Sequence, residues 1–197
     1  MGMKGGRPKG FREDEVLEQA MDLFWRKGYK GAAISDLLTR MGISRQSLYD
    51  TFGNKRNLFI RVLEHYKTTR LSEAIGLLAR DGSDIENVKA VVRFFETIGD
   101  DPECRGCLVA NSLIELVPGE DDVIADLLRS TLGQLQSAIE ESLRRAQACG
   151  ELGSNKSPEQ ISRALTNAMV GMSVTGRLQT TPSQLRDVYA GTLSMLD

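Results

Sequence analysis

Residues 42 to 52 read Gly42-Ile43-Ser44-Arg45-Gln46-Ser47-Leu48-Tyr49-Asp50-Thr51-Phe52, and this stretch decides the fold. Gly42 has the backbone freedom that a tight turn between two helices requires. Ser44 is a suitable helix N-cap, because its hydroxyl can accept a hydrogen bond from a free amide of the next turn. Leu48 and Phe52 are four residues apart and therefore fall on one helix face. The stretch predicts the turn and second helix of a helix-turn-helix.

The opposite face of this second helix carries polar side chains, from Arg45, Gln46, Ser47, Tyr49 and Thr51. A short helix with an apolar back and a polar front suits the DNA major groove, which is wide enough to admit it. Arginine favours guanine and glutamine favours adenine, with about 1–3 kcal/mol of discrimination per bidentate pair. We therefore expect this face to contact DNA, with bases read from the first residues of the helix.

Apolar residues recur at helical spacing through most of the 197 residues, and no alternating strand pattern of useful length is present. The sequence predicts an all-α fold of about nine helices. We expect a flexible basic arm over residues 1–10, a helix-turn-helix DNA-binding domain over 11–53, and a second helical domain over 54–197. A connecting helix over 54–78, about 25 residues long, would join the two domains.

Charge is unevenly distributed along the chain, although the net charge is only −2. Residues 1–70 contain 14 Lys and Arg against 8 Asp and Glu, whereas residues 71–197 contain 11 against 19. A basic first third indicates contact with a polyanion. Within the Gly-rich residues 1–10, Arg7 and Lys9 are candidates for a minor-groove arm, and the alternative is a solvated tail or a cloning remnant.

The sequence also indicates a compartment. No apolar run approaches the roughly 18 residues of a membrane span, and the first ten residues lack the apolar segment of a secretory signal. Three cysteines are too few for a disulfide scaffold. We expect a cytoplasmic protein without a membrane partner.

The chain resembles the TetR family of bacterial transcriptional regulators over roughly residues 10–60. The resemblance rests on Gly28-Tyr29, Asp36-Leu37, Gly42-Ile43-Ser44, Ser47-Leu48-Tyr49, Phe52 and Lys55 at their spacings. It implies a three-helix DNA-binding domain joined by a fourth helix to a ligand-binding domain, and a homodimer formed by the last two helices. The run Arg105-Gly106-Cys107-Leu108 is similar to a motif of one subgroup of the family.

Carried over by position, the resemblance implies DNA contacts on both helices of the motif and on the helix that follows. The implied contacts are Ser35, Ser44, Arg45, Gln46, Ser47, Tyr49, Thr51 and Lys55. Tyr49 and Lys55 resemble phosphate anchors, which fix register and add salt dependence. Asp50 departs from the family pattern. A carboxylate at this position is repelled by phosphate, unless the carboxylate accepts a hydrogen bond from cytosine or pairs with Arg45 or Lys55.

Two further sets of residues are predicted in the second domain. Residues expected to surround a ligand pocket are Phe94, Phe95, Leu108, Asn111, Glu115, Met169 and Met172, although Asn111 and Glu115 could equally form a solvated helix face. The dimer interface is expected at a stripe of small side chains and at the last helix, that is Ala164, Ala168, Gly171, Thr175, Leu185, Val188, Tyr189 and Leu193, with packing inside one chain as the alternative.

The pair Cys104 and Cys107 invites a metal or redox interpretation. One Cys-x-x-Cys supplies half of a tetrahedral zinc site, and a thioredoxin-like site would need a βαβ setting. We expect Cys107 to be a small buried residue and predict neither a metal nor a cofactor. The alternatives are a sensor of oxidants or copper that uses both thiols, and a thiol oxidoreductase.

The sequence therefore predicts a non-enzymatic, dimeric, ligand-responsive regulator. It would act as a repressor released from an inverted-repeat operator by a small-molecule effector bound in the C-terminal domain. The sequence does not identify the effector or the operator.

Overall fold

The computed structural model describes residues 11–99, 103, 105–117, 119–178 and 182–197. This part of the chain is helical without strands, which confirms the all-α prediction. It contains nine helices when α4 and the short helical segments directly after it are counted as one. The chain divides into two compact units, residues 1–65 (unit 1) and 66–197 (unit 2). Within the described ranges, every helix is too short or too polar to cross a bilayer.

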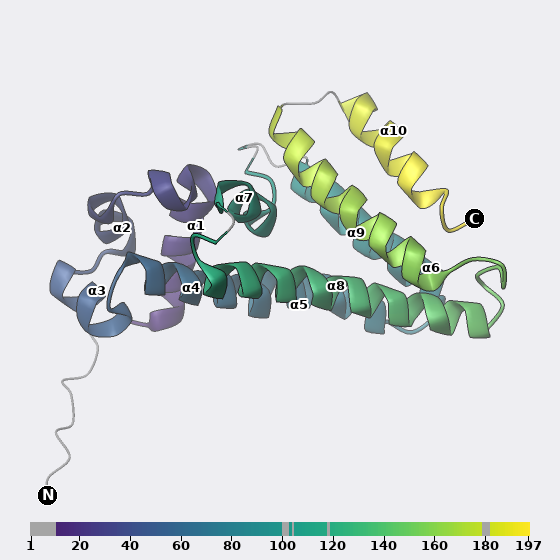
Figure 1. Ribbon diagram of the computed structural model, residues 1–197, viewed down its shortest axis with the longest axis horizontal. Helices are drawn as coiled ribbons and strands as arrows, with labels where there is room; N and C mark the ends of the chain where they lie inside the picture. The colour runs from purple at the N-terminus through teal and green to yellow at the C-terminus, as the bar shows by residue number, and fades with distance from the viewer. Residues whose placement is uncertain (1–10, 100–102, 104, 118, 179–181) are drawn as a thin grey trace, which may run out of the picture. The chain divides into compact units, whose positions relative to one another are not determined.

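Unit 1 contains α1 (Glu13–Gly31), α2 (Ile34–Met41), α3 (Arg45–Phe52) and all but the last residue of α4 (Lys55–Tyr66), as Figure 1 shows. Each helix contributes one apolar face to a common core. Phe24 packs edge-on against Phe59 with ring centroids 4.9 Å apart, and Tyr29 lies 4.8 Å from Phe59. Leu37 and Leu48 are fully buried. The core therefore holds the two helices of the helix-turn-helix in place.

Helix ends in unit 1 follow local chemistry. Gly42 ends α2 in the left-handed conformation, with φ of 65°, where a side chain would be strained. Asn54 caps α4 by accepting from the Asn57 amide at 2.8 Å. Ala33 stands at the N-cap of α2 without a side-chain cap, as expected from the missing hydroxyl. Each of these ends is therefore set by residues close to it in sequence.

The predicted helix over 54–78 has an internal change of helix type. After α4 ends at Tyr66, residues Lys67–Leu71 form a π-helical turn, followed by α5 (Ser72–Gly76) and a 3₁₀ turn, Leu77–Ala79. At the end of the π turn, both the backbone amide and the hydroxyl of Ser72 reach the carbonyl of Lys67, five residues back. That spacing defines a π bond, and apolar periodicity does not reveal it.

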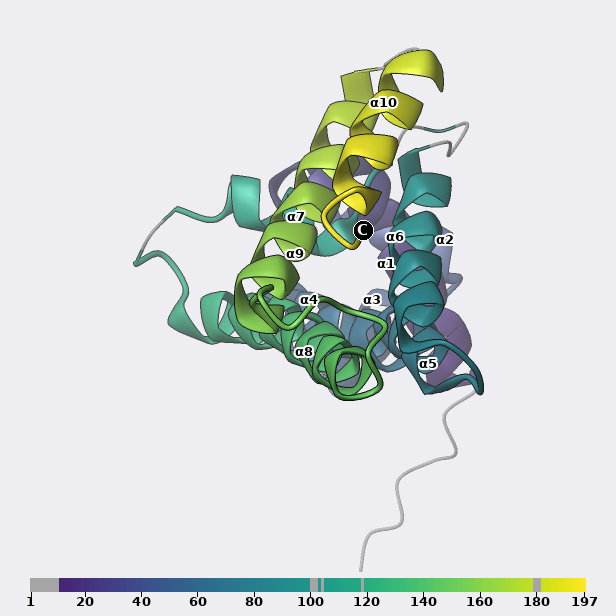
Figure 2. The same cartoon turned by 90° about the vertical axis from the view of Figure 1, so that its right-hand side faces the viewer.

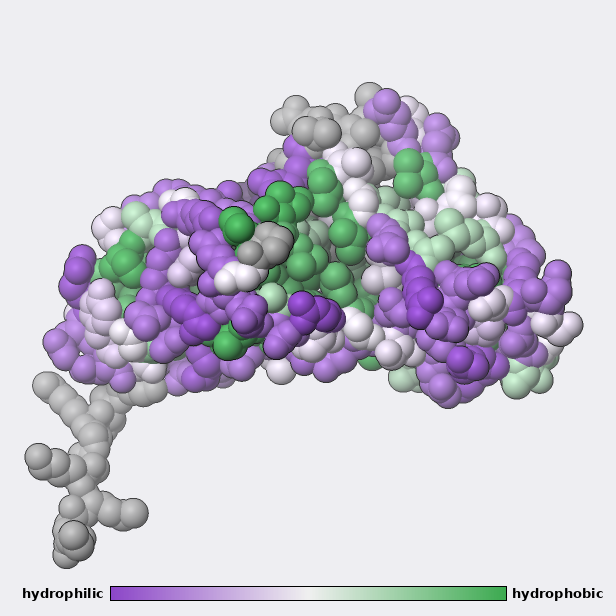
Figure 3. All heavy atoms as spheres, in the orientation of Figure 1, coloured by the Kyte–Doolittle hydropathy of each residue, from purple (hydrophilic) through white to green (hydrophobic). Residues whose placement is uncertain are grey.

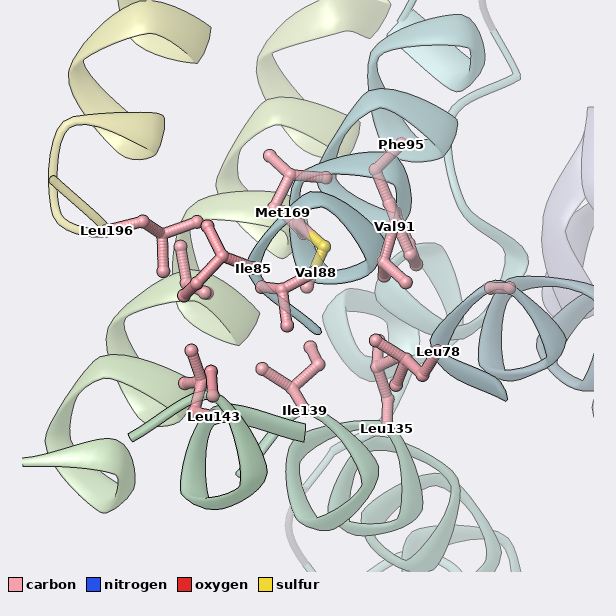
Figure 4. Packing of buried hydrophobic residues seen from close by; sticks show 14 of the residues in the cluster. Leu78, Ile85, Val88, Val91, Phe95, Leu135, Ile139, Leu143, Met169 and Leu196 are labelled. Carbon is pink, nitrogen blue, oxygen red and sulfur yellow. The ribbon is translucent and has the colours of Figure 1, made fainter. Parts of the chain in front are cut away.

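Unit 2 contains α6 (Asp84–Gly99), α7 (Leu108–Glu115), α8 (Asp122–Ala148), α9 (Pro158–Thr175), a 3₁₀ turn (Gly176–Leu178) and α10 (Pro182–Leu193). Helices α6, α8 and α9 contact one another, and α10 packs against α6 and α9 (Figure 2). Their facing side chains form the core in Figure 4, which includes Val88, Val91, Ile139, Leu143 and Met169.

The start of α6 is fixed to α8 by a carboxylate. Arg145 donates to Asp84 at 2.6 Å, and the Ser142 hydroxyl donates to the same carboxylate at 2.9 Å. Burial alone would raise the pKa of Asp84, but the hydrogen bonds from Arg145 and Ser142 outweigh it and hold the pKa below its ordinary value. This contact joins residues 58 and 61 positions apart in sequence.

Candidate nucleic-acid interface and interior cavity

Helix α3 is amphipathic in the way that the sequence predicts. Leu48 is fully buried and Phe52 is 4% exposed, so this face anchors the helix in unit 1. Arg45, Gln46 and Tyr49 lie exposed on the other face, and the Tyr49 side chain is 43% exposed although it is aromatic. An aromatic side chain exposed to this extent, beside an exposed arginine, is accessible to a partner.

Ser44 fixes the first turn of α3. Its side-chain oxygen accepts a hydrogen bond from the Ser47 backbone amide at 3.1 Å, as expected of an N-cap. The two hydroxyls of Ser44 and Ser47 are also within hydrogen-bonding distance of each other, at 2.9 Å. Both hydroxyls therefore contribute to the geometry of the turn that presents Arg45 and Gln46.

Asp50 has a partner that the sequence interpretation did not consider. The Gln46 side-chain amide donates to the Asp50 carboxylate at 2.8 Å. Glutamine and aspartate four residues apart on a helix are a known stabilising pair, so the spacing itself was the available signal. The bond orients the Gln46 amide at the exposed surface and leaves its carbonyl oxygen free to accept from a base.

The remaining predicted DNA contacts lie on three elements. Ser35 is exposed at the start of α2, Thr51 is half-buried on α3, and Lys55 begins α4 with its amine 4.8 Å from the ring centre of Tyr29. The predicted arm residues Arg7 and Lys9 lie outside the described residues.

Ion pairs hold α2 against α1. Lys27 contacts Asp36 at 2.6 Å and Arg40 contacts Asp22 at 2.6 Å. The hydrogen bond from Lys27 lowers the pKa of the Asp36 carboxyl. These carboxylates pair with cations of their own unit, and Gln46 engages the Asp50 carboxylate. The exposed face of α3 therefore carries Arg45 beside a carboxylate that is already hydrogen-bonded.

In unit 2, the Arg105-Gly106-Cys107-Leu108 run is a tightly packed turn. Gly106 has φ of +65°, and a β-carbon there would lie 2.5 Å from the carbonyl oxygen of Ser173. Asn111 donates to the Arg105 carbonyl at 2.7 Å and accepts from Arg177 at 3.0 Å. The Asn111 amide therefore joins this turn to the end of α9, and both ends of the amide are already hydrogen-bonded within the chain.

An enclosed cavity lies between α6, α7, α8, α9 and the π turn. Its free volume is about 30 Å³, which is room for a single water molecule. Three of the predicted pocket residues, Phe94, Phe95 and Met169, line it. The other four, Leu108, Asn111, Glu115 and Met172, are not among its lining residues. The lining residues that the sequence interpretation did not single out as pocket residues are Tyr66, Arg70, Leu71, Ala74, Cys107, Val109, Thr131, Leu132, Leu135, Thr166, Val170 and Ser173.

Cys107 is buried in the wall of this cavity, as the sequence predicts. Its sulfur lies 3.4 Å from the hydroxyl of Tyr66. Burial, together with the neighbouring thiol, raises the pKa of Tyr66 well above its ordinary value, so the phenol is neutral. Cys104 lies outside the described residues. Within the described ranges, no group of three or more Cys, His, Asp or Glu side chains is placed to hold a metal ion.

The predicted dimer residues lie partly on the surface of the single chain. Ala164 and Ala168 are half-buried on α9, whereas Gly171 and Thr175 are exposed. On α10, Val188 is 51% exposed, and Tyr189 and Leu193 are half-buried against the core of unit 2. The Leu185 side chain lies outside the described residues. The exposed members of the predicted set are therefore Gly171 and Thr175 on α9 and Val188 on α10, and these three define an open strip.

Both units match models of known protein families. Residues 16–62 match the model described as bacterial regulatory proteins of the tetR family. Residues 85–191 match the model of a tetracyclin repressor-like C-terminal domain. The first match covers the helix-turn-helix and the second covers most of unit 2.

Whole-chain relatives agree with these matches. The chain is 32% identical to the uncharacterised helix-turn-helix transcriptional regulator YezE of Bacillus subtilis, over 98% of this chain and all of the relative. It is 29% identical to the transcriptional repressor ComR of Escherichia coli, over 96% and 91% of the two chains. Among solved structures, a cysteine mutant of the transcriptional regulator CifR in complex with 26-base-pair operator DNA superimposes with a TM-score of 0.85. That alignment has 30% identity and covers 95% and 98% of the two chains.

Proposed function

The chain belongs to the TetR family of bacterial transcriptional regulators, and from this premise we propose that it is a homodimeric repressor that an effector releases from its operator. The observation that carries the proposal is the helix α3. It is anchored by Leu48 and Phe52, capped by Ser44, and presents Arg45, Gln46 and Tyr49 to solvent. ComR carries the name of a repressor, and the CifR structure contains operator DNA, which supports the same role here.

Base contacts in this proposal come from Arg45 and Gln46, and phosphate contacts come from Tyr49 and Lys55. Arg45 stands at the first position of α3, where a side chain can reach the floor of the major groove. Gln46 presents a carbonyl acceptor because its amide nitrogen donates to Asp50. Ser35 and Thr51 would add contacts to the DNA backbone that fix the register of the protein on the duplex.

Dimerisation would use the open strip on α9 and α10. Gly171 supports this assignment, because a β-carbon added there meets nothing within 4 Å in the single chain. Small side chains allow two helices to approach closely, and a two-fold axis would bring the strip against its own copy. Two α3 helices would then meet the two halves of an inverted repeat.

The effector would bind in the cavity of unit 2, where Phe94, Phe95 and Met169 supply apolar walls. Binding would favour a dimer in which the two α3 helices no longer match the operator spacing.

We also assign the chain to the subgroup that carries the Arg-Gly-Cys-Leu motif. The support is that Gly106 has no room for a side chain, so this position requires the glycine of the motif.

Binding to DNA from upstream of the protein's own gene tests the proposal, with fluorescence anisotropy at two salt concentrations. Arg45→Ala and Tyr49→Ala remove exposed α3 side chains without touching the core. Arg144→Ala removes an exposed arginine of unit 2 and controls for charge. We expect salt-sensitive binding that the first two variants lose and the control retains. Equal binding by all four proteins would reject α3 as the reading helix.

A further inference from the structure

The hydroxyl of Thr166 is buried without a hydrogen-bond partner among the residues that the structure describes. Thr166 is only 6% exposed and lies in the middle of α9. Burying a hydroxyl without a hydrogen-bond partner destabilises the folded state, so such groups are rare in folded proteins. The position of this hydroxyl therefore requires an explanation.

Other hydroxyls of α9 behave differently. Ser162 donates to the Glu159 carbonyl at 3.0 Å, Ser173 donates to Met169 at 2.8 Å, and Thr175 donates to Gly171 at 3.0 Å. Bonding back to the preceding turn is the ordinary solution for a hydroxyl inside a helix. Thr166 does not use it, and its side chain instead lines the enclosed cavity.

The other polar groups in the cavity wall are already engaged. Thr131 donates to the Leu127 carbonyl at 2.7 Å, and the Tyr66 hydroxyl lies against the Cys107 sulfur. The remaining wall is mostly apolar, with Phe94, Phe95 and Met169 among its residues. Ser173 bonds within its own helix and Arg70 has a partner within the chain, so Thr166 is the hydroxyl of this wall that has no partner among the described residues.

Thr166 also lies at the boundary between the cavity and the surface. Thr166 and Leu132 line both the enclosed cavity and an open groove formed by α7, α8 and α9. Leu113 and Leu116 contribute apolar walls to the groove, and Figure 3 shows apolar side chains gathered on the surface around α7. A molecule entering from this groove would pass Leu132 and meet the Thr166 hydroxyl.

We infer that the cavity of unit 2 takes a compact, uncharged, mainly apolar molecule with one hydrogen-bonding oxygen, which the Thr166 hydroxyl binds. This inference rests on the proposed effector response and names the chemical class of the effector. Compactness follows from the small free volume, because each further atom must displace packed side chains. Absence of charge follows from the wall as a whole: Arg70 already has a partner within the chain, and the rest of the wall is mostly apolar, so a buried ion is strongly disfavoured.

The test compares phenol with toluene, which have similar size and differ by one hydroxyl. Binding is followed by NMR of protein labelled with ¹³C at the methionine methyl groups, because the Met169 methyl lies in the cavity wall and is fully buried. Met169→Leu identifies the resonance. We expect both probes to shift it saturably. Thr166→Val should weaken the binding of phenol, relative to that of toluene, by about 3- to 10-fold, which corresponds to the loss of one hydrogen bond.

Thr131→Val is the matched control, because it removes a hydroxyl from the same wall that already bonds to its own helix. It should change the phenol-to-toluene ratio by less than about twofold. Thr166→Ser keeps the hydroxyl and should restore most of the preference. The inference is overturned if neither probe moves the Met169 resonance, or if Thr166→Val weakens both probes equally. It is also overturned if benzoate binds more tightly than phenol.

Operator release is measured separately, so the two proposals can fail independently. If phenol binds at Met169 and leaves operator binding unchanged, the cavity assignment stands and its role in effector response fails. If the wild-type protein binds no DNA, the regulator proposal fails, while the NMR titration still decides the ligand class.

Discussion

Gln46 donates its side-chain amide to the carboxylate of Asp50 at 2.8 Å, so the second residue of α3 is oriented by a residue one turn later. Asp50 also places a negative charge on the face proposed to meet DNA. In the proposed complex with DNA, Asp50 would therefore have two opposing effects. It would orient a side chain proposed to read a base, and it would repel the phosphate backbone.

Asp50→Ala should separate these effects. Loss of the carboxylate should increase affinity for unrelated DNA, because repulsion from phosphate disappears. Loss of the bond to Gln46 should reduce discrimination at the base read by Gln46, by up to about 1–3 kcal/mol. Anisotropy titrations with operator and scrambled DNA at two salt concentrations measure both quantities. Tighter binding to both DNAs with unchanged discrimination would mean that Asp50 does not position Gln46.

Ser44→Ala should destabilise unit 1 by about 1 kcal/mol, because α3 loses the acceptor of its first free amide. Ser44→Gly is the matched control and should cost only a few tenths of a kcal/mol, since glycine also suits an N-cap. Urea denaturation gives both values. Equal losses in the two variants would show that the cap bond contributes little.

Gly106→Ala should destabilise unit 2 more than a glycine substitution that meets only backbone strain. Gly150→Ala supplies that reference, because Gly150 has φ of +80° and open space around it. Strain alone costs about 1–2 kcal/mol. Gly106→Ala should lower the free energy of unfolding by a further ~1–3 kcal/mol, since its β-carbon would meet the Ser173 carbonyl. Thermal or urea unfolding compares them, and equal costs would contradict the close packing.

Gly171→Glu should convert the dimer to a monomer. The side chain has room on a single chain, so the fold should be retained, but an interface there would bury an unpaired carboxylate. Gly76→Glu places the same charge on another exposed helical glycine and should remain dimeric. Light scattering after size-exclusion chromatography gives the masses. A dimeric Gly171→Glu variant would place the interface elsewhere.

Acid should destabilise the protein partly through Asp84. The folded state holds the pKa of Asp84 below its unfolded value, so the stabilisation is present above that unfolded value, near 4. It is lost as the pH falls through the folded pKa. Asp84→Asn should therefore unfold with a weaker pH dependence between about pH 5 and pH 2. Asp126→Asn removes an exposed carboxylate and controls for net charge. Identical pH dependence in Asp84→Asn and wild type would contradict the contribution of Asp84.

Local patterns in the sequence were sufficient to predict most of the helices, including α3. Apolar spacing located the helices, and the predicted cap at Ser44 is in place because it depends on a residue three positions away. The π turn after Tyr66 was not predicted, because one shifted backbone bond leaves apolar spacing almost unchanged.

Contacts between segments that are far apart in the chain could not be predicted from the sequence. Asn111 was predicted from its polarity to face a ligand, and in the structure its amide joins Arg105 to Arg177. Thr166 was not singled out, because its unpaired hydroxyl depends on how α9 packs against α8 and α7. A sequence pattern assigns a face to a residue, but it does not identify the groups that meet that face.

A DNase I footprint on DNA upstream of the protein's own gene is the most direct test of the proposed regulator. We predict one protected inverted repeat, with half-sites about one helical turn or a multiple of it apart, read by two α3 helices. Arg45→Ala should abolish the protection and Arg144→Ala should preserve it. Protection without two-fold symmetry, or protection that survives Arg45→Ala, would contradict a dimer that reads its operator through α3.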